Sequence, residues 1–393
     1  MGLLMERHSC KPPRVKITNM GGAVGFAALL VLALGCGDSG SDGAGGAGTG
    51  GSGSGGAAEC AAAEPTEILA DVVADHLAIS GETLVFIDRT QGEPFPSGAQ
   101  GGAIRAISTD GQDDRILYTA PADHLLLSIR VTADAVYFLE DTYAGPGSDD
   151  VALSHVPLAG GSSVLVGSLD LALDPQGNSL MAIESDAAYV NMGMDGLVRV
   201  ALPGGAVSTI TAEHVLNNAD VVGDDIFYSA APAIGEQILT RISKSATDGT
   251  GTPLLDDDCS TGLATSNGIF CKVVDAAQAS LVRYELDGSG PTTLVDLGRL
   301  QDFPPSVVAS DDANVYLAAS DLPSLAGHPI SRVPAAGGGK TAVACDRHQF
   351  TFTMAPYPTN SGRREQFVLG TTDLFWIEQR TESGPIGLYR IAK

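Results

Sequence analysis

The stretch Asp220-Val221-Val222-Gly223-Asp224-Asp225-Ile226-Phe227-Tyr228 decides the fold of this chain. It begins with a short apolar strand, turns through one Gly and two Asp residues, and continues into a hydrophobic strand with an aromatic residue at its centre. Short runs of β-branched and aromatic residues bounded by Gly and Asp are typical of β-strands joined in hairpins. We therefore expect an antiparallel hairpin at residues 220–228.

The second strand of this hairpin recurs along the chain as a hydrophobic triplet, usually with an aromatic residue at its centre. The seven copies are Leu84-Val85-Phe86, Val136-Tyr137-Phe138, Ala188-Tyr189-Val190, Ile226-Phe227-Tyr228, Ile269-Phe270-Cys271, Val315-Tyr316-Leu317 and Leu374-Phe375-Trp376. Their central residues lie 52, 52, 38, 43, 46 and 59 positions apart, which brackets the roughly 40–50-residue period of propeller blades. The chain is therefore built from repeats.

Two further strands follow each copy. The first of them usually carries Arg at one fixed point, in Arg199-Val200, Arg241-Ile242, Arg283-Tyr284, Arg332-Val333 and Arg390-Ile391, with His155-Val156 and Ala106-Ile107 as variants. A glycine turn and a last strand come next, for example Ser163-Val164-Leu165-Val166. Four antiparallel strands repeated seven times predict an all-β, seven-bladed β-propeller. Six blades are the alternative if one of the seven copies does not form a blade.

The seventh repeat stops after its third strand, at Lys393. The segment Thr66-Glu67-Ile68-Leu69-Ala70 resembles the fourth strands of the other repeats. We expect this N-terminal segment to complete the last blade, because ring closure removes exposed sheet edges.

The repeats resemble TolB-like and YWTD-like propellers, and also the uncharacterised propeller lipoproteins with "VYW…KVPLxGG" repeats. The resemblance covers roughly residues 66–393. It implies a propeller fold and no particular activity, because propellers host many activities.

The N-terminus has the form of a secretory signal. Residues 1–20 are basic, and the apolar run from Gly21 to Gly35 is shorter than the roughly 20 residues that span a bilayer. Cys36 directly follows Ala33-Leu34-Gly35, which resembles the lipobox of bacterial lipoproteins except that Ala33 stands where the family prefers Leu. We expect lipidation at Cys36, with an ordinary cleaved signal as the alternative.

Three regions follow from this reading. Residues 1–35 form the lipoprotein signal peptide, residues 36–63 the lipidated cysteine and a flexible Gly/Ser linker, and residues 64–393 the propeller domain. The expected location is the cell envelope, with the protein lipid-anchored at the outer membrane and facing the periplasm or the cell surface.

The charge balance excludes one class of partner. The formal net charge is −25, with 44% hydrophobic and only 18% charged residues. Such a composition favours a packed fold over disorder, and the negative charge repels phosphate backbones. We therefore expect no nucleic-acid partner.

Four cysteines lie beyond the lipidation site, namely Cys60, Cys259, Cys271 and Cys345. An even number in an exported chain predicts two disulfides. Cys259 and Cys271 flank one predicted hairpin and form the first candidate pair, which leaves Cys60 for Cys345. Other pairings and free buried thiols are the alternatives.

No catalytic signature stands out. The chain lacks Gly-x-Ser-x-Gly, Cys-x-x-Cys and paired-His spacings, so we expect no catalytic residue and no metal-ligand set. We expect no cofactor. Calcium is the alternative, because acidic clusters such as Asp256-Asp257-Asp258 offer oxygen ligands, but these clusters lack the spacing of an EF-hand.

The long insertions fall on one predicted face of the propeller, where the second and third strands and successive blades are connected. Loops vary where function is added to a fold. The residues expected at the channel mouth on this face begin each innermost strand. They are His76, Ser128, Ser179, Asn218, Thr261, Ser306 and Gln366. These polar residues could hold a ligand or only a column of water.

The leading functional hypothesis is a monomeric, non-enzymatic binding module that recognises an envelope protein or glycan through the long-loop face. The alternative is a propeller enzyme of the lactonase or dehydrogenase type with its site at the channel mouth. A purely structural spacer is the third possibility.

Overall fold

The computed structural model describes most of the repeat region. The described residues are 63–89, 101–143, 149–169, 178–232, 237–255, 259, 262–299, 305–318, 329–344, 366–379 and 386–393. Within these ranges every regular element is a β-strand except one short 3-10 turn, Gly193–Asp195, which confirms the all-β prediction. No helix in the same ranges has the length and apolar character needed to cross a membrane.

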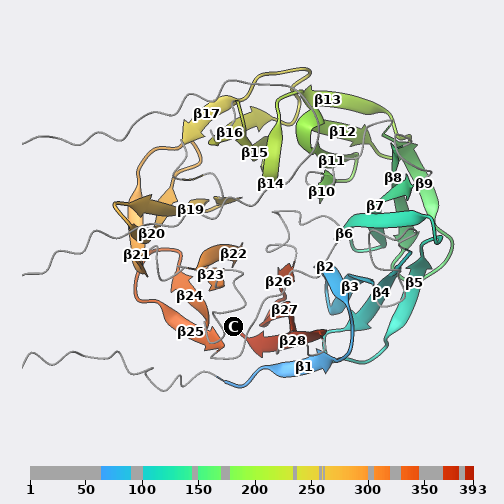
Figure 1. The fold of residues 1–393 in the computed structure, drawn as a ribbon, viewed down its shortest axis with the longest axis horizontal. Helices are drawn as coiled ribbons and strands as arrows, with labels where there is room; N and C mark the ends of the chain where they lie inside the picture. Colours follow the sequence, from blue (N-terminus) through green and yellow to red (C-terminus); the bar gives the residue numbers. More distant parts are fainter. Residues whose placement is uncertain are drawn as a thin grey trace, which may run out of the picture. The chain divides into compact units, whose positions relative to one another are not determined.

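The strands form seven four-stranded antiparallel sheets, which are the blades of a ring (Figure 1). Blades one to four consist in turn of β2 (Ala74–Ser80), β3 (Thr83–Asp88), β4 (Ala103–Ser108) and β5 (Arg115–Thr119); β6 (His124–Val131), β7 (Ala135–Tyr143), β8 (Asp149–Pro157) and β9 (Val164–Ser168); β10 (Asn178–Ile183), β11 (Ala187–Met192), β12 (Leu197–Ala201) and β13 (Val207–Thr211); β14 (Val215–Val222), β15 (Asp225–Ala230), β16 (Ile238–Ser243) and β17 (Thr252–Leu255). Blades five to seven consist of β18 (Leu263–Thr265), β19 (Gly268–Asp275), β20 (Gln278–Tyr284) and β21 (Thr292–Arg299); β22 (Ser306–Ser310), β23 (Asn314–Ala318), β24 (Ile330–Pro334) and β25 (Thr341–Ala344); β26 (Phe367–Leu369), β27 (Asp373–Gln379), β28 (Ile386–Ala392) and β1 (Thr66–Leu69).

The last blade is completed from the N-terminal side, as predicted. β1 pairs antiparallel with β28, and Thr66 lies opposite Arg390. Figure 1 shows the blue β1 alongside the red β28. The seven-blade prediction is confirmed, and the six-blade alternative is wrong.

The repeated aromatic residue and the repeated arginine are cross-strand partners. Each residue at the centre of the triplet lies opposite the fixed point of the next strand, in the pairs Val85–Ala106, Tyr137–His155, Tyr189–Arg199, Phe227–Arg241, Phe270–Arg283, Tyr316–Arg332 and Phe375–Arg390. Directly opposed side chains are close enough to interact, and the same register of second and third strands recurs in every blade.

The core lies between neighbouring blades rather than inside any one sheet. Trp376 of blade seven packs in one cluster with Tyr316 of blade six, and Ile87 of blade one packs with Leu126 of blade two. Both faces of the second strands are therefore covered, and all six residues of β11 are buried. This explains why the sequences of these strands are continuous apolar runs and do not alternate between apolar and polar residues. Each fully buried large apolar side chain contributes about 1.5–3 kcal/mol.

The innermost strands carry a recurring irregularity. As far as the described residues run, five of the seven shift register against the second strand. The shifts lie between Asp75 and Ala78, Leu126 and Ser128, Leu180 and Ala182, Leu216 and Ala219, and Val307 and Ala309. An extra residue of this kind is a β-bulge, which bends the strand and redirects side chains.

The two ends of the blades differ in their connections. Short hairpin turns join first to second strands at one end, for example Gly223 and Asp224 between β14 and β15. Every internal segment outside the described residues joins a second strand to a third, or a fourth strand to the next blade. Antiparallel topology places the strand ends that flank these segments at the opposite end of the blades, and we call this end the loop face.

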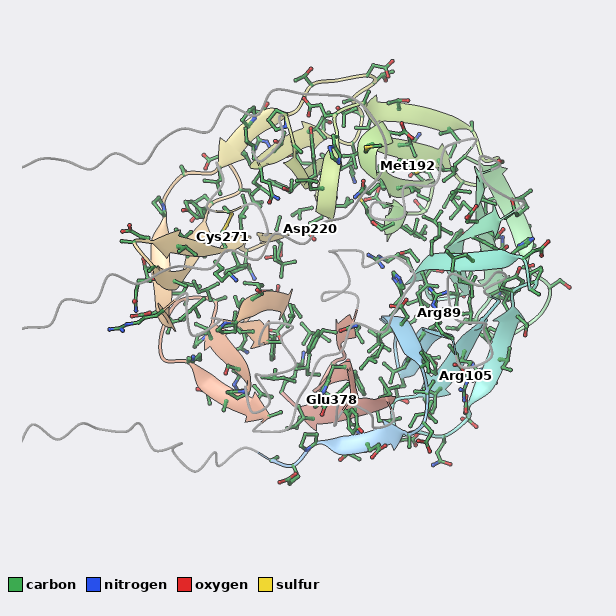
Figure 2. All side chains as sticks on the ribbon, viewed as in Figure 1. Arg89, Arg105, Met192, Asp220, Cys271 and Glu378 are labelled. Atoms are coloured by element: carbon green, nitrogen blue, oxygen red, sulfur yellow. A yellow bond between two sulfur atoms is a disulfide. The ribbon has the colours of Figure 1, made fainter. Side chains whose placement is uncertain are left out.

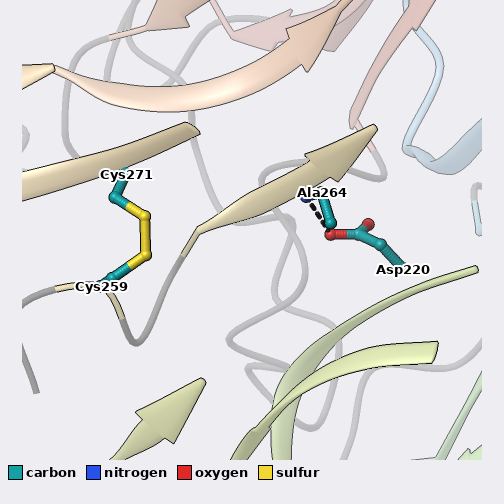
Figure 3. The surroundings of a disulfide bond; sticks show 4 residues. All are labelled: Asp220, Cys259, Ala264 and Cys271. Carbon is teal, nitrogen blue, oxygen red and sulfur yellow. Dashed lines mark hydrogen bonds between the residues drawn. A yellow bond between two sulfur atoms is a disulfide. The ribbon is translucent and has the colours of Figure 1, made fainter. Parts of the chain in front are cut away.

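One predicted disulfide is present. Cys259 and Cys271 are bonded, with their Cα atoms 5.1 Å apart, and both are buried. Figure 3 shows this bond near the contact in which the backbone N–H of Ala264 donates to Asp220 Oδ2 over 2.9 Å. Cys60 and Cys345 lie outside the described residues, as do the signal peptide, Cys36 and the linker, so these assignments stay predictions.

Candidate functional site at the mouth of the ring

The loop-face ends of the first and second strands surround the axis of the ring. Consecutive innermost strands contact one another from β2 through β26 and back to β2, as Figure 1 shows. We call this ring of strand ends the mouth.

The structure places the predicted mouth residues at related but unequal positions. His76 lies in the bulge of β2, Ser128 directly follows the bulge of β6, Asn218 lies in the shifted part of β14, Ser179 and Ser306 begin or nearly begin β10 and β22, and Gln366 directly precedes β26. Thr261 lies outside the described residues, and so does the side chain of Asn218. That these residues bind a ligand stays a prediction.

A cluster of hydrogen-bonded, buried polar residues lies at the mouth between blades one and two. Asp75 of β2 is buried, and its Oδ1 accepts the backbone N–H of His76 over 3.0 Å. Arg89, directly after β3, donates from Nη2 to Asp75 Oδ2 over 3.2 Å and to the carbonyl oxygen of Leu126 on β6 over 2.7 Å. The arginine therefore links blade one to the bulged strand of blade two.

The charge of Asp75 is stabilised by these neighbours. Burial alone would raise its pKa, but the electrostatic interactions and hydrogen bonds with His76 and Arg89 outweigh burial, so the pKa lies below its ordinary value. A carboxylate held in its charged form next to a guanidinium keeps the arginine in one orientation.

Arg89 has donors left over. Its Nε and Nη1 are buried, and neither has a hydrogen-bond partner among the described residues. Ser128 Oγ, fully buried on β6, likewise has no partner among them. Leaving a buried donor unpaired costs about 1–3 kcal/mol, so these atoms need an explanation. A guanidinium presents its donors in a fork that matches a carboxylate or phosphate.

A second polar group lies in the same interface. The hydroxyl of Tyr118 on β5 donates to Glu140 Oε1 over 2.8 Å, and His124 Nδ1 lies 3.2 Å from the same oxygen. Burial raises the pKa of Tyr118, and the hydrogen bond to Glu140 raises it further. The phenol therefore remains a donor at neutral pH and fixes the carboxylate at the edge of the mouth.

Two other second strands, β11 and β27, carry a buried polar residue directly before their last residue. Asn191 of blade three accepts the backbone N–H of Gly193 over 2.8 Å, and its Nδ2 has no partner among the described residues. Glu378 of blade seven accepts the indole N–H of Trp376 over 2.7 Å. Arg89 and Glu378 are labelled in Figure 2. The described residues contain no group of three or more His, Cys, Asp or Glu side chains that could hold a metal ion.

Sequence reasoning missed Arg89. It looked for residues that begin the innermost strands, whereas Arg89 follows a second strand. The usable signal was the pair Asp88-Arg89 at the end of a buried apolar run, because charged residues at such a point must be paired or reach the solvent.

Comparison with known proteins supports the fold alone. No family model and no curated protein matches the chain. The β-propeller domain of the Trilobed protease from Pyrococcus furiosus has a TM-score of 0.54 at 11% identity, over 82% of this chain and 95% of that chain. Puromycin hydrolase has a TM-score of 0.51 at 10% identity, over 80% of this chain and 51% of that one. TolB from Acinetobacter baumannii has a TM-score of 0.42 at 13% identity, over 67% of each chain.

The seven sheets, together with the similarity to the archaeal propeller domain, define the chain as a seven-bladed β-propeller. The archaeal domain is reported to have an open velcro topology, whereas here β1 hydrogen-bonds to β28 and completes the last blade. TolB is among the similar structures, but membership of a TolB-like family stays a prediction.

Proposed function

We propose that this protein is a non-enzymatic binding module of the cell envelope, anchored by a lipid on Cys36, that recognises a carboxylate-bearing protein or glycan through its loop face. The unpaired donors of Arg89 carry the proposal. Asp75 and the carbonyl oxygen of Leu126 hold the guanidinium in place before any partner arrives, and such preorganisation lowers the cost of binding.

The rest of the mouth supports recognition of a polar group. Ser128 Oγ and Asn191 Nδ2 are buried polar atoms without a partner among the described residues, and a ligand with several oxygens would pair with them. The net charge of −25 slows association with a strongly acidic partner. The recognised carboxylate is therefore an isolated one rather than part of a polyanion.

Photo-cross-linking in producing cells tests which face binds. A photoreactive residue replaces Asp123, exposed at the loop face directly before β6, or Ala133, exposed in the opposite turn of the same blade. We expect a discrete adduct from position 123 and none from position 133. Protease digestion of the adduct separates a protein partner from a glycan. Equal adducts from both positions, or an adduct from position 133 alone, would contradict the proposal.

The anchor is tested separately by Cys36→Ser. The variant should leave the membrane fraction and appear as soluble protein with the same β-sheet circular dichroism. If it stays in the membrane fraction, the lipid on Cys36 is not the anchor.

A further inference from the structure

A pocket lies in blade four, away from Arg89. Its volume is about 380 Å³, and the residues around it include Glu213 and His214 from the connection between β13 and β14, together with Pro232, Ile238, Thr240 and Gly251 from blade four. This volume is within the range of about 300–1,000 Å³ that is typical of small-molecule sites.

Glu213 is held rigidly at the wall of this pocket. Its Oε2 accepts a hydrogen bond from the hydroxyl of Tyr228 and another, over 3.4 Å, from the backbone N–H of Gly251. Burial raises the pKa of Tyr228, and its bond to Glu213 raises it further. The phenol thus stays protonated and keeps donating to the carboxylate.

The space beside Glu213 depends on Gly251. A Cβ atom at this position would lie 2.2 Å from Thr240 Cγ2 and 2.3 Å from the Tyr228 hydroxyl oxygen. Only glycine therefore lets the backbone approach closely enough to donate to the carboxylate.

In the part of the chain that the structure describes, no cationic side chain pairs with this carboxylate. Among the described residues Glu213 forms no ion pair, and His214 on the same wall is not within ion-pair distance of it. Much of the remaining wall is apolar, with Pro232 and Ile238 among its residues. A carboxylate next to an apolar surface loses hydration, and a bound cation offsets that loss.

We propose that this pocket binds a small organic amine, with the ammonium group on Glu213 and an apolar body against Pro232 and Ile238. An ammonium has three donors and no acceptor, which suits Glu213 and the hydroxyls of Thr240 and Thr250 in the same wall. The negative charge of the whole chain raises the local concentration of cations and repels anions. This site shares no residue with the loop-face contact proposed for Arg89, so either proposal can fail without the other.

Binding of three matched probes to the full-length mature chain tests the pocket. Benzylamine, benzyl alcohol and phenylacetate share an aromatic body and differ in the charge of the polar group. Isothermal titration calorimetry should detect benzylamine binding at millimolar concentration and no binding of the other two. Hydrogen–deuterium exchange should show added protection at Ala231 and Gly251. Binding of benzyl alcohol as tight as that of benzylamine, or protection elsewhere only, would overturn the proposal, as would no benzylamine binding.

A charge-removing variant sharpens the test. Glu213→Gln keeps an oxygen acceptor for Tyr228 and Gly251 but removes the charge, so benzylamine affinity should fall at least about tenfold. Glu285→Gln, at an exposed position on blade five with 59% side-chain exposure, is the matched control and should leave affinity unchanged. Equal affinity in wild type and Glu213→Gln would overturn the proposal. The three-probe comparison on the wild type decides the question if Glu213→Gln does not fold.

Discussion

Arg89 and Arg105 lie on opposite faces of blade one, and their surroundings differ. Arg105 lies on the face toward blade seven, where Asp88 and Asp114 both accept from it and its guanidinium lies 5.5 Å from the centre of the Phe86 ring. Arg89 lies on the face toward blade two, and two of its three nitrogens have no partner among the described residues. Carboxylates thus take the donors of Arg105, whereas the remaining donors of Arg89 are the ones that we propose to bind a ligand.

The carboxylates beside the two arginines differ in number and burial. Asp75, beside Arg89, has 7% of its side chain exposed, whereas Arg105 is shared between Asp88, with 5% exposed, and Asp114, with 34% exposed. Breaking a buried ion pair leaves an uncompensated charge, whereas an exposed pair is screened by water. The Arg89 side therefore has one buried ion pair at the place where we propose binding, whereas Arg105 joins one buried and one partly exposed carboxylate on the other face.

Removing the buried carboxylate is expected to have the largest effect. Asp75→Asn should lower the free energy of unfolding by about 3–5 kcal/mol, because Arg89 would keep its charge in a buried interface without its partner. Asp114→Asn should lower it by less than about 1 kcal/mol. Urea denaturation followed by circular dichroism measures both, and equal losses in the two variants would remove the contrast.

Removing Arg105 is expected to have an intermediate effect. Arg105→Ala deletes the ion pairs with Asp88 and Asp114 and the contact with Phe86, and should cost about 2–3 kcal/mol because the buried Asp88 loses a charged hydrogen-bond donor. Loop-face cross-linking from position 123 should not change. A loss of cross-linking in a folded Arg105→Ala variant would show that this arginine is more than structural.

The effect of acid is a smaller test of the same pair. The pKa of Asp75 is lowered in the folded state, so its charge stabilises the fold above its unfolded pKa of about 3.9. That contribution is lost as the pH falls through the lower folded value. The stability difference between wild type and Asp75→Asn should be constant from pH 7 to about 4 and shrink below that. A difference that grows in acid would reverse the sign and contradict the assignment.

The smallest expected effect is at Ser128. Ser128→Ala removes a buried hydroxyl that has no partner among the described residues. The free energy of unfolding should therefore stay the same or rise by up to about 1 kcal/mol. Ser108→Ala is the control, because its hydroxyl bonds to Gln112 and its loss should destabilise slightly. A clear loss of stability in Ser128→Ala would show that the hydroxyl has a structural partner.

The architecture could be predicted from the sequence because short local patterns of residues define each repeat. The hairpin at residues 220–228 gave the strand type and turn, and the recurring pair of aromatic and arginine residues lies opposite across strands in the structure. The closing strand at Thr66 was found by the same comparison. Such features depend on residues that are close in sequence, so they can be predicted without knowledge of the tertiary structure.

The site was harder to predict because it depends on contacts between blades. Nothing near Arg89 in sequence shows that it reaches Leu126, 37 residues away, and no periodicity predicts which donors remain unpaired. The bulges that place His76 and Ser128 differently also cannot be read from the repeat, since an added residue looks like ordinary variation in spacing. The position within the repeat predicts which residues lie at the mouth. The different positions that these residues take there are known only from the structure.

The conservative variant Arg89→Lys tests the central claim most directly. Lysine keeps a positive charge beside Asp75 but lacks the fork of donors that fits a carboxylate. With the photoreactive residue at position 123, Arg89→Lys should reduce the adduct at least about fivefold without unfolding the protein. Arg105→Lys should leave it unchanged. An undiminished adduct in Arg89→Lys, or an equal loss in both variants, would contradict the account.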